Sequence, residues 1–122
     1  MTLDFFSPEN SMRATPEETS ILSMGAKPYS DGYRLRVHIE ITPFQKQPYV
    51  EILLINAEGE EVASTNIIEP MGWKLEFTMH LREEELKNPY TLQATLYYPD
   101  GPSKEPQTFS FNVEPPSDVE QA

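Results

Sequence analysis

Two kinds of side chain in this sequence have the chemistry to act as catalysts or ligands: clustered glutamates and a pair of histidines. Glutamates crowd the stretches 58–61 and 83–85, and the histidines stand at positions 38 and 80. Paired carboxylates can serve as general acid and base, and carboxylate oxygens are the ligands that calcium prefers. A calcium loop, however, needs Asp or Asn at alternating positions and a Gly at its bend. Neither stretch has this pattern, so we interpret both as solvated charge in turns.

The two histidines fall at polar positions of two alternating segments, 33–42 and 73–81. An antiparallel register between these segments brings together Glu40 with Lys74, His38 with Glu76, and Arg34 with His80. The histidines then stand four residues apart along the strands, roughly 13 Å at the rise of a β-strand, which is too far to share a metal ion. The register that would bring them together sets Arg36 against Arg82, a like-charge contact. We therefore expect a solvent-facing ladder of mixed charges.

Sequence motifs of catalytic sites are missing from the chain. It has no Gly-x-Ser-x-Gly, no Gly-x-Gly-x-x-Gly, no Walker loop and no His-Glu-x-x-His. It also has no cysteine, which removes disulfides, thiolate nucleophiles and zinc sites built on sulfur. We expect a protein that is not an enzyme and that uses no cofactor and no metal.

The net charge of the 122-residue chain is −11. A surface of this sign repels the phosphates of nucleic acids and the anionic headgroups of membranes, so we expect neither as a partner. The first residues lack the basic and apolar runs of a secretory signal, and no apolar segment approaches the ~18 residues of a membrane-spanning helix. We expect a cytoplasmic protein, although a mature exported domain would have the same features.

The chain divides into an N-terminal arm (1–17), a single domain (18–114) and a tail (115–122) that we expect to be disordered. The arm is polar and contains prolines, yet it carries Leu3, Phe5 and Phe6, so it is either flexible or folded back. The domain reads as seven extended segments separated by turn signals, at about 21–29, 33–42, 49–56, 60–68, 73–81, 90–98 and 109–113. This pattern predicts an all-β fold, a seven-stranded antiparallel sandwich of two sheets.

One local pattern, LKNPYTLQATL from Leu86 to Leu96, resembles the entry to the sixth strand of immunoglobulin-like and fibronectin type III-like sandwiches. The resemblance extends over residues 21–114 and singles out no family within that superfamily. It implies that Leu86 packs under the sheet and that Tyr90 begins the strand with its hydroxyl bonded back to the backbone. The same resemblance makes the expected sandwich immunoglobulin-like, and it implies no activity, because this fold carries unrelated functions.

The segment VEILLIN, Val50 to Asn56, is apolar on both sides of a predicted strand. Its inner side would face the core, and its outer side needs another cover. The candidate interface on this outer face comprises Tyr49, Leu53, Ile55, Ala63, Ile67, Thr95 and Tyr97. Three covers are possible: the N-terminal arm, a second copy of the chain in a homodimer, or a different protein. A soluble monomer rarely exposes a contiguous apolar area of this size.

Two hypotheses for function follow from this face. The first is a non-enzymatic protein-interaction module that presents the apolar face to a protein partner or to itself. The second is a module that binds a carbohydrate or another small ligand by stacking it on Tyr49, Tyr97 and Tyr98. Aliphatic residues are mixed with these aromatic rings, which suits protein contacts better than sugar rings.

Overall fold

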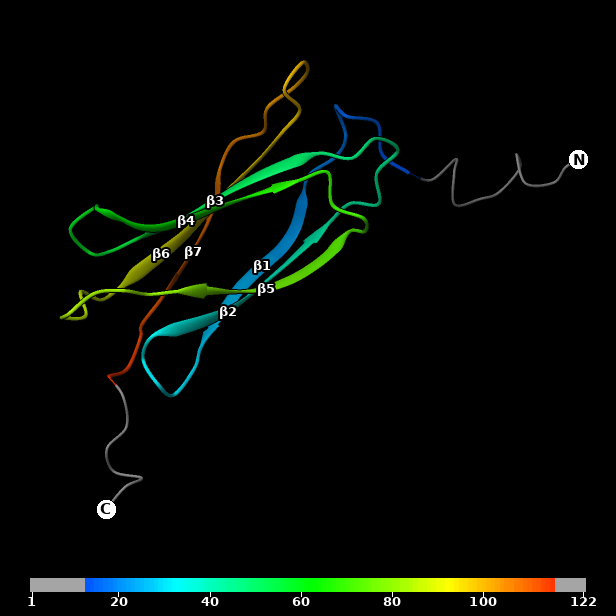
Figure 1. Cartoon of the computed structure of the whole chain (residues 1–122). Coiled ribbons are helices and arrows are strands. Elements are labelled where there is room, and N and C mark those ends of the chain that lie inside the picture. Colours follow the sequence, from blue (N-terminus) through cyan, green and yellow to red (C-terminus); the bar gives the residue numbers. More distant parts are fainter. Residues whose placement is uncertain (1–12, 116–122) are drawn as a thin grey trace, which may run out of the picture.

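The computed structural model describes residues 13–115, and their strands form two antiparallel sheets packed face to face (Figure 1). One sheet has the strand order β1-β2-β5 and the other β4-β3-β6-β7. The strands are β1 (Ile21–Pro28), β2 (Arg34–Ile41), β3 (Tyr49–Ile55), β4 (Glu61–Ile68), β5 (Lys74–His80), β6 (Tyr90–Tyr97) and β7 (Gln107–Phe111). The predicted seven-stranded all-β sandwich is therefore confirmed. Among the described residues, no helix has the length and apolarity to cross a membrane.

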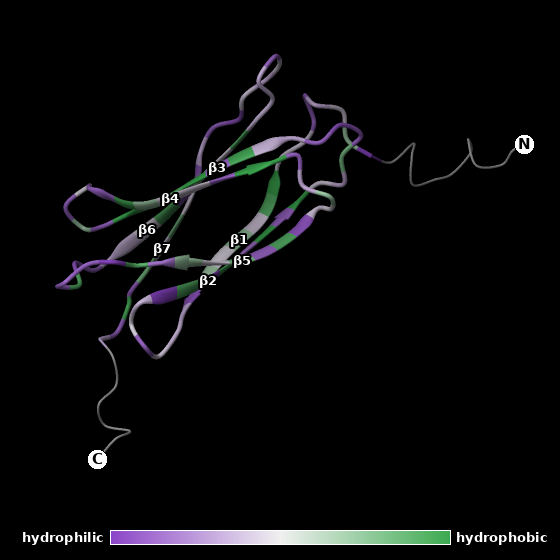
Figure 2. Cartoon of the chain, viewed as in Figure 1, coloured by the Kyte–Doolittle hydropathy of each residue, from purple (hydrophilic) through white to green (hydrophobic). Residues whose placement is uncertain are grey.

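Strand β2 shows how the sequence pattern produces these sheets. Its residues alternate between apolar and polar, and Figure 2 shows the same banding along β2 and β5. The apolar set is fully buried between the sheets, while Arg34, Arg36 and His38 are exposed. The register expected between β2 and β5 is confirmed: Glu40 stands opposite Lys74, His38 opposite Glu76, and Arg34 opposite His80.

The core lies between the inner faces of β2, β3 and β6. Each of these strands contributes a run of alternate side chains with almost no exposed surface, such as Val50, Ile52 and Leu54 of β3. The edge strands are less covered, since Leu75 and Phe77 of β5 are only half-buried. Burial of apolar surface in the central strands is the main stabilising contribution to the fold.

The β3–β4 hairpin has the turn that its sequence predicts. The Gly59 N–H donates to the carbonyl of Asn56 at 3.0 Å, and Gly59 adopts a φ of 83°. A residue with a Cβ is disfavoured at this φ, which explains the glycine. The pairing of β3 with β4 shifts between Leu54 and Ile55, where an extra residue on β4 forms a bulge.

The described part of the predicted N-terminal arm is bound to the sandwich. The Ala14 N–H donates to the carbonyl of Pro43 at 2.7 Å, and the Gln45 N–H donates to the carbonyl of Ala14 at 2.9 Å. Ala14 is buried, and the Arg13 guanidinium lies 5.5 Å from the centre of the Trp73 ring. These contacts are with the loops at one end of the sandwich. Residues 1–12, with Leu3, Phe5 and Phe6, and the tail residues 116–122 lie outside the described residues.

Candidate functional site

The predicted apolar face is the outer surface of the sheet β4-β3-β6-β7. Tyr49, Leu53 and Ile55 of β3 occupy it together with Thr95 and Tyr97 of β6. Their side chains are half-buried, neither covered nor bare. Residues directly opposite each other in an antiparallel pair point to the same face, and Tyr49 stands opposite Tyr97.

The prediction was wrong for two members of this face, Ala63 and Ile67 of β4. Ala63 stands opposite Leu54, and Ile67 stands opposite Val50, so both point toward the core, against which they pack. Side chains alternate along a strand, and a register different by one residue moves every side chain to the other face. The outer positions of β4 belong instead to Ser64, Asn66 and Ile68.

The aromatic part of the face is compact. The rings of Tyr49 and Tyr97 lie 5.5 Å apart between centroids and are tilted by 46°. Asn66 Nδ2 donates to Tyr97 Oη at 3.5 Å, and the side chain of Ile68, opposite Tyr49, is 58% exposed. Tyr98, expected beside these rings, points into the core, and its hydroxyl donates to the carbonyl of Lys46 at 2.8 Å.

Polar residues interrupt the remainder of this outer face. Leu53 is flanked by Ser64 on β4 and Gln93 on β6, and Glu51 separates it from Tyr49. The face is therefore a mixed surface, with a small aromatic and aliphatic corner, and not the continuous apolar area expected from β3 alone. Protein interfaces of moderate size have this composition.

The outer face of the other sheet carries the charged ladder. Arg36 Nη2 lies 3.0 Å from Glu76 Oε1, and the hydrogen bond from this guanidinium lowers the pKa of Glu76. The Arg34 guanidinium lies 4.3 Å from the centre of the Tyr29 ring. The His38 ring lies across the backbone of Gly25, where a Cβ would come within 2.5 Å of His38 Cε1. This face is an exposed polar surface, as predicted.

Both glutamate stretches include residues that do more than interact with solvent. At one end of the sandwich, Asn56 Nδ2 donates to Glu60 Oε1 at 3.0 Å and to Glu83 Oε2 at 3.1 Å. The bond from Asn56, and then the charge of Lys87, lower the pKa of Glu60. Glu83 is half-buried, whereas Glu84 and Glu85 are exposed. The interpretation as solvated charge is therefore incomplete for Glu60 and Glu83, which make specific bonds, and holds for the exposed Glu84 and Glu85.

Tyr90 is the corner residue that the resemblance implies. Its hydroxyl accepts a hydrogen bond from the Lys87 N–H at 2.9 Å and donates one to Glu83 Oε1. The side chain is fully buried, and burial together with the bond to Glu83 raises the pKa of Tyr90 to about 12. Leu86 packs against the core, as expected. These bonds order the approach to β6, and the bond from Asn56 to Glu83 joins this approach to the β3–β4 hairpin.

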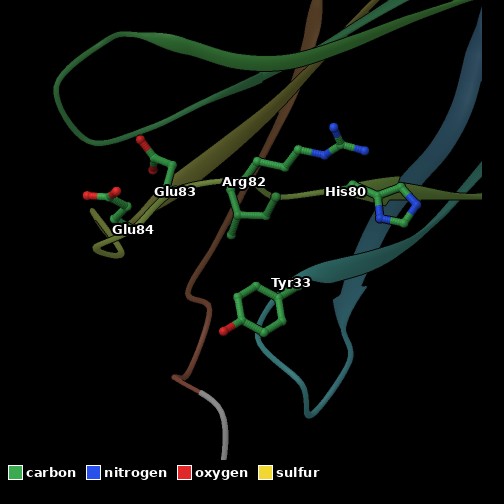
Figure 3. Close-up of a pocket in the computed structure, with 6 residues that line it drawn as sticks. Tyr33, His80, Arg82, Glu83 and Glu84 are labelled. Carbon is green, nitrogen blue, oxygen red and sulfur yellow. The ribbon is translucent and has the colours of Figure 1, made fainter.

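An open pocket of about 490 Å³ lies beside the end of β5 (Figure 3). It is lined by Tyr33, His80, Leu81, Arg82, Glu83 and Glu84. Glu83 and Glu84 lie on one side of the pocket and His80 on the other (Figure 3). Glu83 is held by Tyr90 and Asn56. Within residues 13–115, no group of three or more His, Asp or Glu residues is placed to hold a metal ion.

Comparison with known proteins establishes the type of fold and nothing finer. No family model and no curated protein sequence matches the chain. A glycosyl hydrolase family 2 member from Bacteroides cellulosilyticus is similar in structure, with a TM-score of 0.54 and 13% identity over 78% of this chain and 14% of the enzyme. Ruminococcus gnavus β-glucuronidase has a TM-score of 0.53 and 20% identity over 79% of this chain and 16% of the enzyme. The chain thus spans less than a fifth of these enzymes' length.

Two features of the site escaped the sequence analysis. Ile68 belongs to the outer face, and the pairing of Ile68 with Tyr49 could have been found only by placing the bulge after Leu54 correctly. Glu83 belongs to a hydrogen-bonded network, and the signal was the short distance in sequence between Glu83 and the corner tyrosine, Tyr90.

Proposed function

We propose that the protein is a non-enzymatic binding module, a member of the immunoglobulin-like superfamily that docks a protein partner on the outer face of β4-β3-β6-β7. The observation that carries the proposal is the corner formed by Tyr49, Tyr97 and Ile68, which is bordered by the polar residues Asn66, Thr95 and Glu51. Interfaces are enriched in such aromatic anchors, and a polar rim surrounds them. On the opposite face, charged residues of β2 and β5 form a ladder, and the Tyr29 ring lies 4.3 Å from the Arg34 guanidinium.

The exposed apolar area limits the strength of binding. Full burial of a large apolar side chain contributes about 1.5–3 kcal/mol. Most of the Tyr49 and Tyr97 surface is already covered, so docking adds less than about 1 kcal/mol for each, and somewhat more for Ile68. Association itself costs at least about 4 kcal/mol. The face therefore suits a transient partner, held by several such contacts, and not a permanent one.

The test is capture of partners from a lysate of the native host by the wild-type protein and by two charge-matched variants. Ile68→Glu places a carboxylate at the exposed corner of the proposed face. Thr78→Glu places one on the exposed face of β5, on the other sheet. We expect a protein that the wild type and Thr78→Glu both retain and that Ile68→Glu loses by tenfold or more. A partner retained equally by both variants, or none retained by the wild type, would refute the proposal.

A second candidate is a carbohydrate-binding module, favoured by the tilted Tyr49–Tyr97 pair with Asn66 and Thr95 beside it. Aromatic rings can stack on sugar rings, and amide and hydroxyl groups can bond to sugar hydroxyls. The two similar structures are those of glycosyl hydrolases, which is consistent with this alternative. A glycan array would show binding that Tyr97→Ala abolishes and Tyr33→Ala preserves. Absence of binding to every glycan would exclude it.

A further inference from the structure

The two sheets differ in how their edge strands are protected. The edge strands of β1-β2-β5 have charged residues, a proline and an irregular register, features that disfavour pairing with another strand. Strand β1 has an irregular register between Ile21 and Ser23 and ends in Lys27 and Pro28, while β5 begins with Lys74 and carries further charge along its length. Neither edge is a regular, uncharged template for a new strand.

Strand β4, at an edge of the other sheet, has none of these protective features over most of its length. From Val62 to Ile68 it carries no charge and no proline, and it is rich in β-branched residues. Such a segment has a high propensity to pair with another strand. The other edge of this sheet, β7, is also uncharged but is shorter, and its Gln107 amide donates to the carbonyl of Ile21 on β1. The β7 edge is therefore partly closed by the neighbouring sheet, and β4 is the more open one.

The surface beside β4 is also hollow. A shallow pocket of about 340 Å³ runs between β4 and the end of β5. Its β4 side is formed by residues 62–65, and its β5 side by Thr78, Met79 and His80, with Arg82 following. An edge strand leaves alternate backbone N–H and C=O groups unpaired. The edge of β4 thus combines unpaired backbone groups with adjacent space for side chains of a further strand.

We propose that the β4 edge pairs with the β4 edge of a second copy of this chain, antiparallel and about a two-fold axis. A second copy fits this edge because the segment from Val62 to Ile68 carries no charge, so two molecules of net charge −11 meet the least local repulsion there. With the axis at Thr65, Ser64 meets Asn66 of the second copy, and Ala63 meets Ile67 of the second copy. Small residues meet larger ones on both faces, so the edge is complementary to itself.

The dimer would join two sheets of four strands into one continuous sheet. The outer faces of the two copies would then lie side by side in one surface, and this surface would contain two Tyr49–Tyr97 pairs, one from each copy. The backbone hydrogen bonds of the new pair would supply affinity that the half-buried face does not. The inference does not depend on the function proposed above, because it concerns the edge of the sheet and not the docking of a partner on its face.

The test compares molar mass by sedimentation across a concentration series for the wild type and two matched double variants. Ser64→Lys with Asn66→Lys introduces lysines that meet across the proposed two-fold axis. Thr108→Lys with Ser110→Lys makes the same change on the same face of the same sheet, at exposed positions of β7. All four positions are exposed, so the fold should tolerate both changes, and circular dichroism would confirm it.

We expect the wild type and the β7 variant to reach twice the 14.0 kDa mass of the chain. The β4 variant should dimerise at least about tenfold more weakly. A wild type that stays monomeric up to millimolar concentration would overturn the inference. So would a dimer that survives the β4 lysines, or one that the β7 lysines disrupt equally. The two proposals are distinguished by Ile68→Glu: loss of partner capture with unchanged dimerisation in that variant would support the docking face without bearing on the β4 dimer.

Discussion

Replacement of Tyr90 by phenylalanine tests the corner that joins β6 to the β3–β4 hairpin. The phenyl ring keeps the packing of the fully buried side chain and removes only its hydroxyl. Two hydrogen bonds disappear: the one accepted from the Lys87 N–H and the one donated to the Glu83 carboxylate. A neutral hydrogen bond contributes about 0.5–1.5 kcal/mol net, and a bond to a charged group about 1.5–3 kcal/mol. We expect Tyr90→Phe to lower the free energy of unfolding by about 2–4 kcal/mol.

Urea denaturation at pH 7 measures this change directly. The control is Tyr33→Phe, since the Tyr33 side chain is 56% exposed and the same atom is removed from a solvated ring. Such a surface change should stay within about 0.5 kcal/mol. If Tyr90→Phe were no more destabilising than Tyr33→Phe, the corner hydrogen bonds would contribute nothing net, and our account of this network would be wrong.

The pH dependence supplies a second, independent check. The pKa of Tyr90 rises from an ordinary value of 10.0 to about 12 in the folded protein, first because of burial and then because of the bond to Glu83. A raised folded-state pKa stabilises the protein fully below the unfolded value, and the contribution is lost as pH rises from 10 toward 12. The phenylalanine variant lacks this ionisation. The stability difference between wild type and Tyr90→Phe should therefore shrink by about 1.4 kcal/mol between pH 8 and pH 11.

Two further substitutions separate buried from exposed polar contacts. Asn56→Asp removes the donor to Glu60 and Glu83 and adds a third carboxylate beside them. We expect it to lower the free energy of unfolding by about 2–4 kcal/mol at pH 7. The loss should be smaller at pH 4, because carboxyls are protonated there. Thermal denaturation at both pH values measures this, with the exposed Asn112→Asp as control, and an effect independent of pH would contradict the reasoning. Arg36→Ala removes the ion pair between Arg36 and Glu76. Because both side chains are more than half exposed, the melting temperature should not change measurably. A decrease of more than about 3 °C would show that this surface pair contributes to stability after all.

Much of the architecture could be predicted from local sequence. The alternation from Arg34 to Ile41 determined both the strand and the face it buries, because the side-chain period of a strand is two. Charge complementarity was enough to select the register of β2 against β5. The corner pattern around Leu86 and Tyr90 depends on contacts within a few residues, so it too was visible in the sequence.

The sequence by itself determined which segments become strands, because alternation and turn residues act over a few positions. Only the tertiary structure decided which face of the sheet each residue of β4 occupies. The extra residue on β4, at the register shift between Leu54 and Ile55, turns the side chains of Ala63 and Ile67 toward the core. The tertiary structure also decided that Glu83 meets Asn56, because two turns distant in sequence come together only when the sheets pack. Register and long-range contacts depend on the whole core, and no short stretch of sequence contains them.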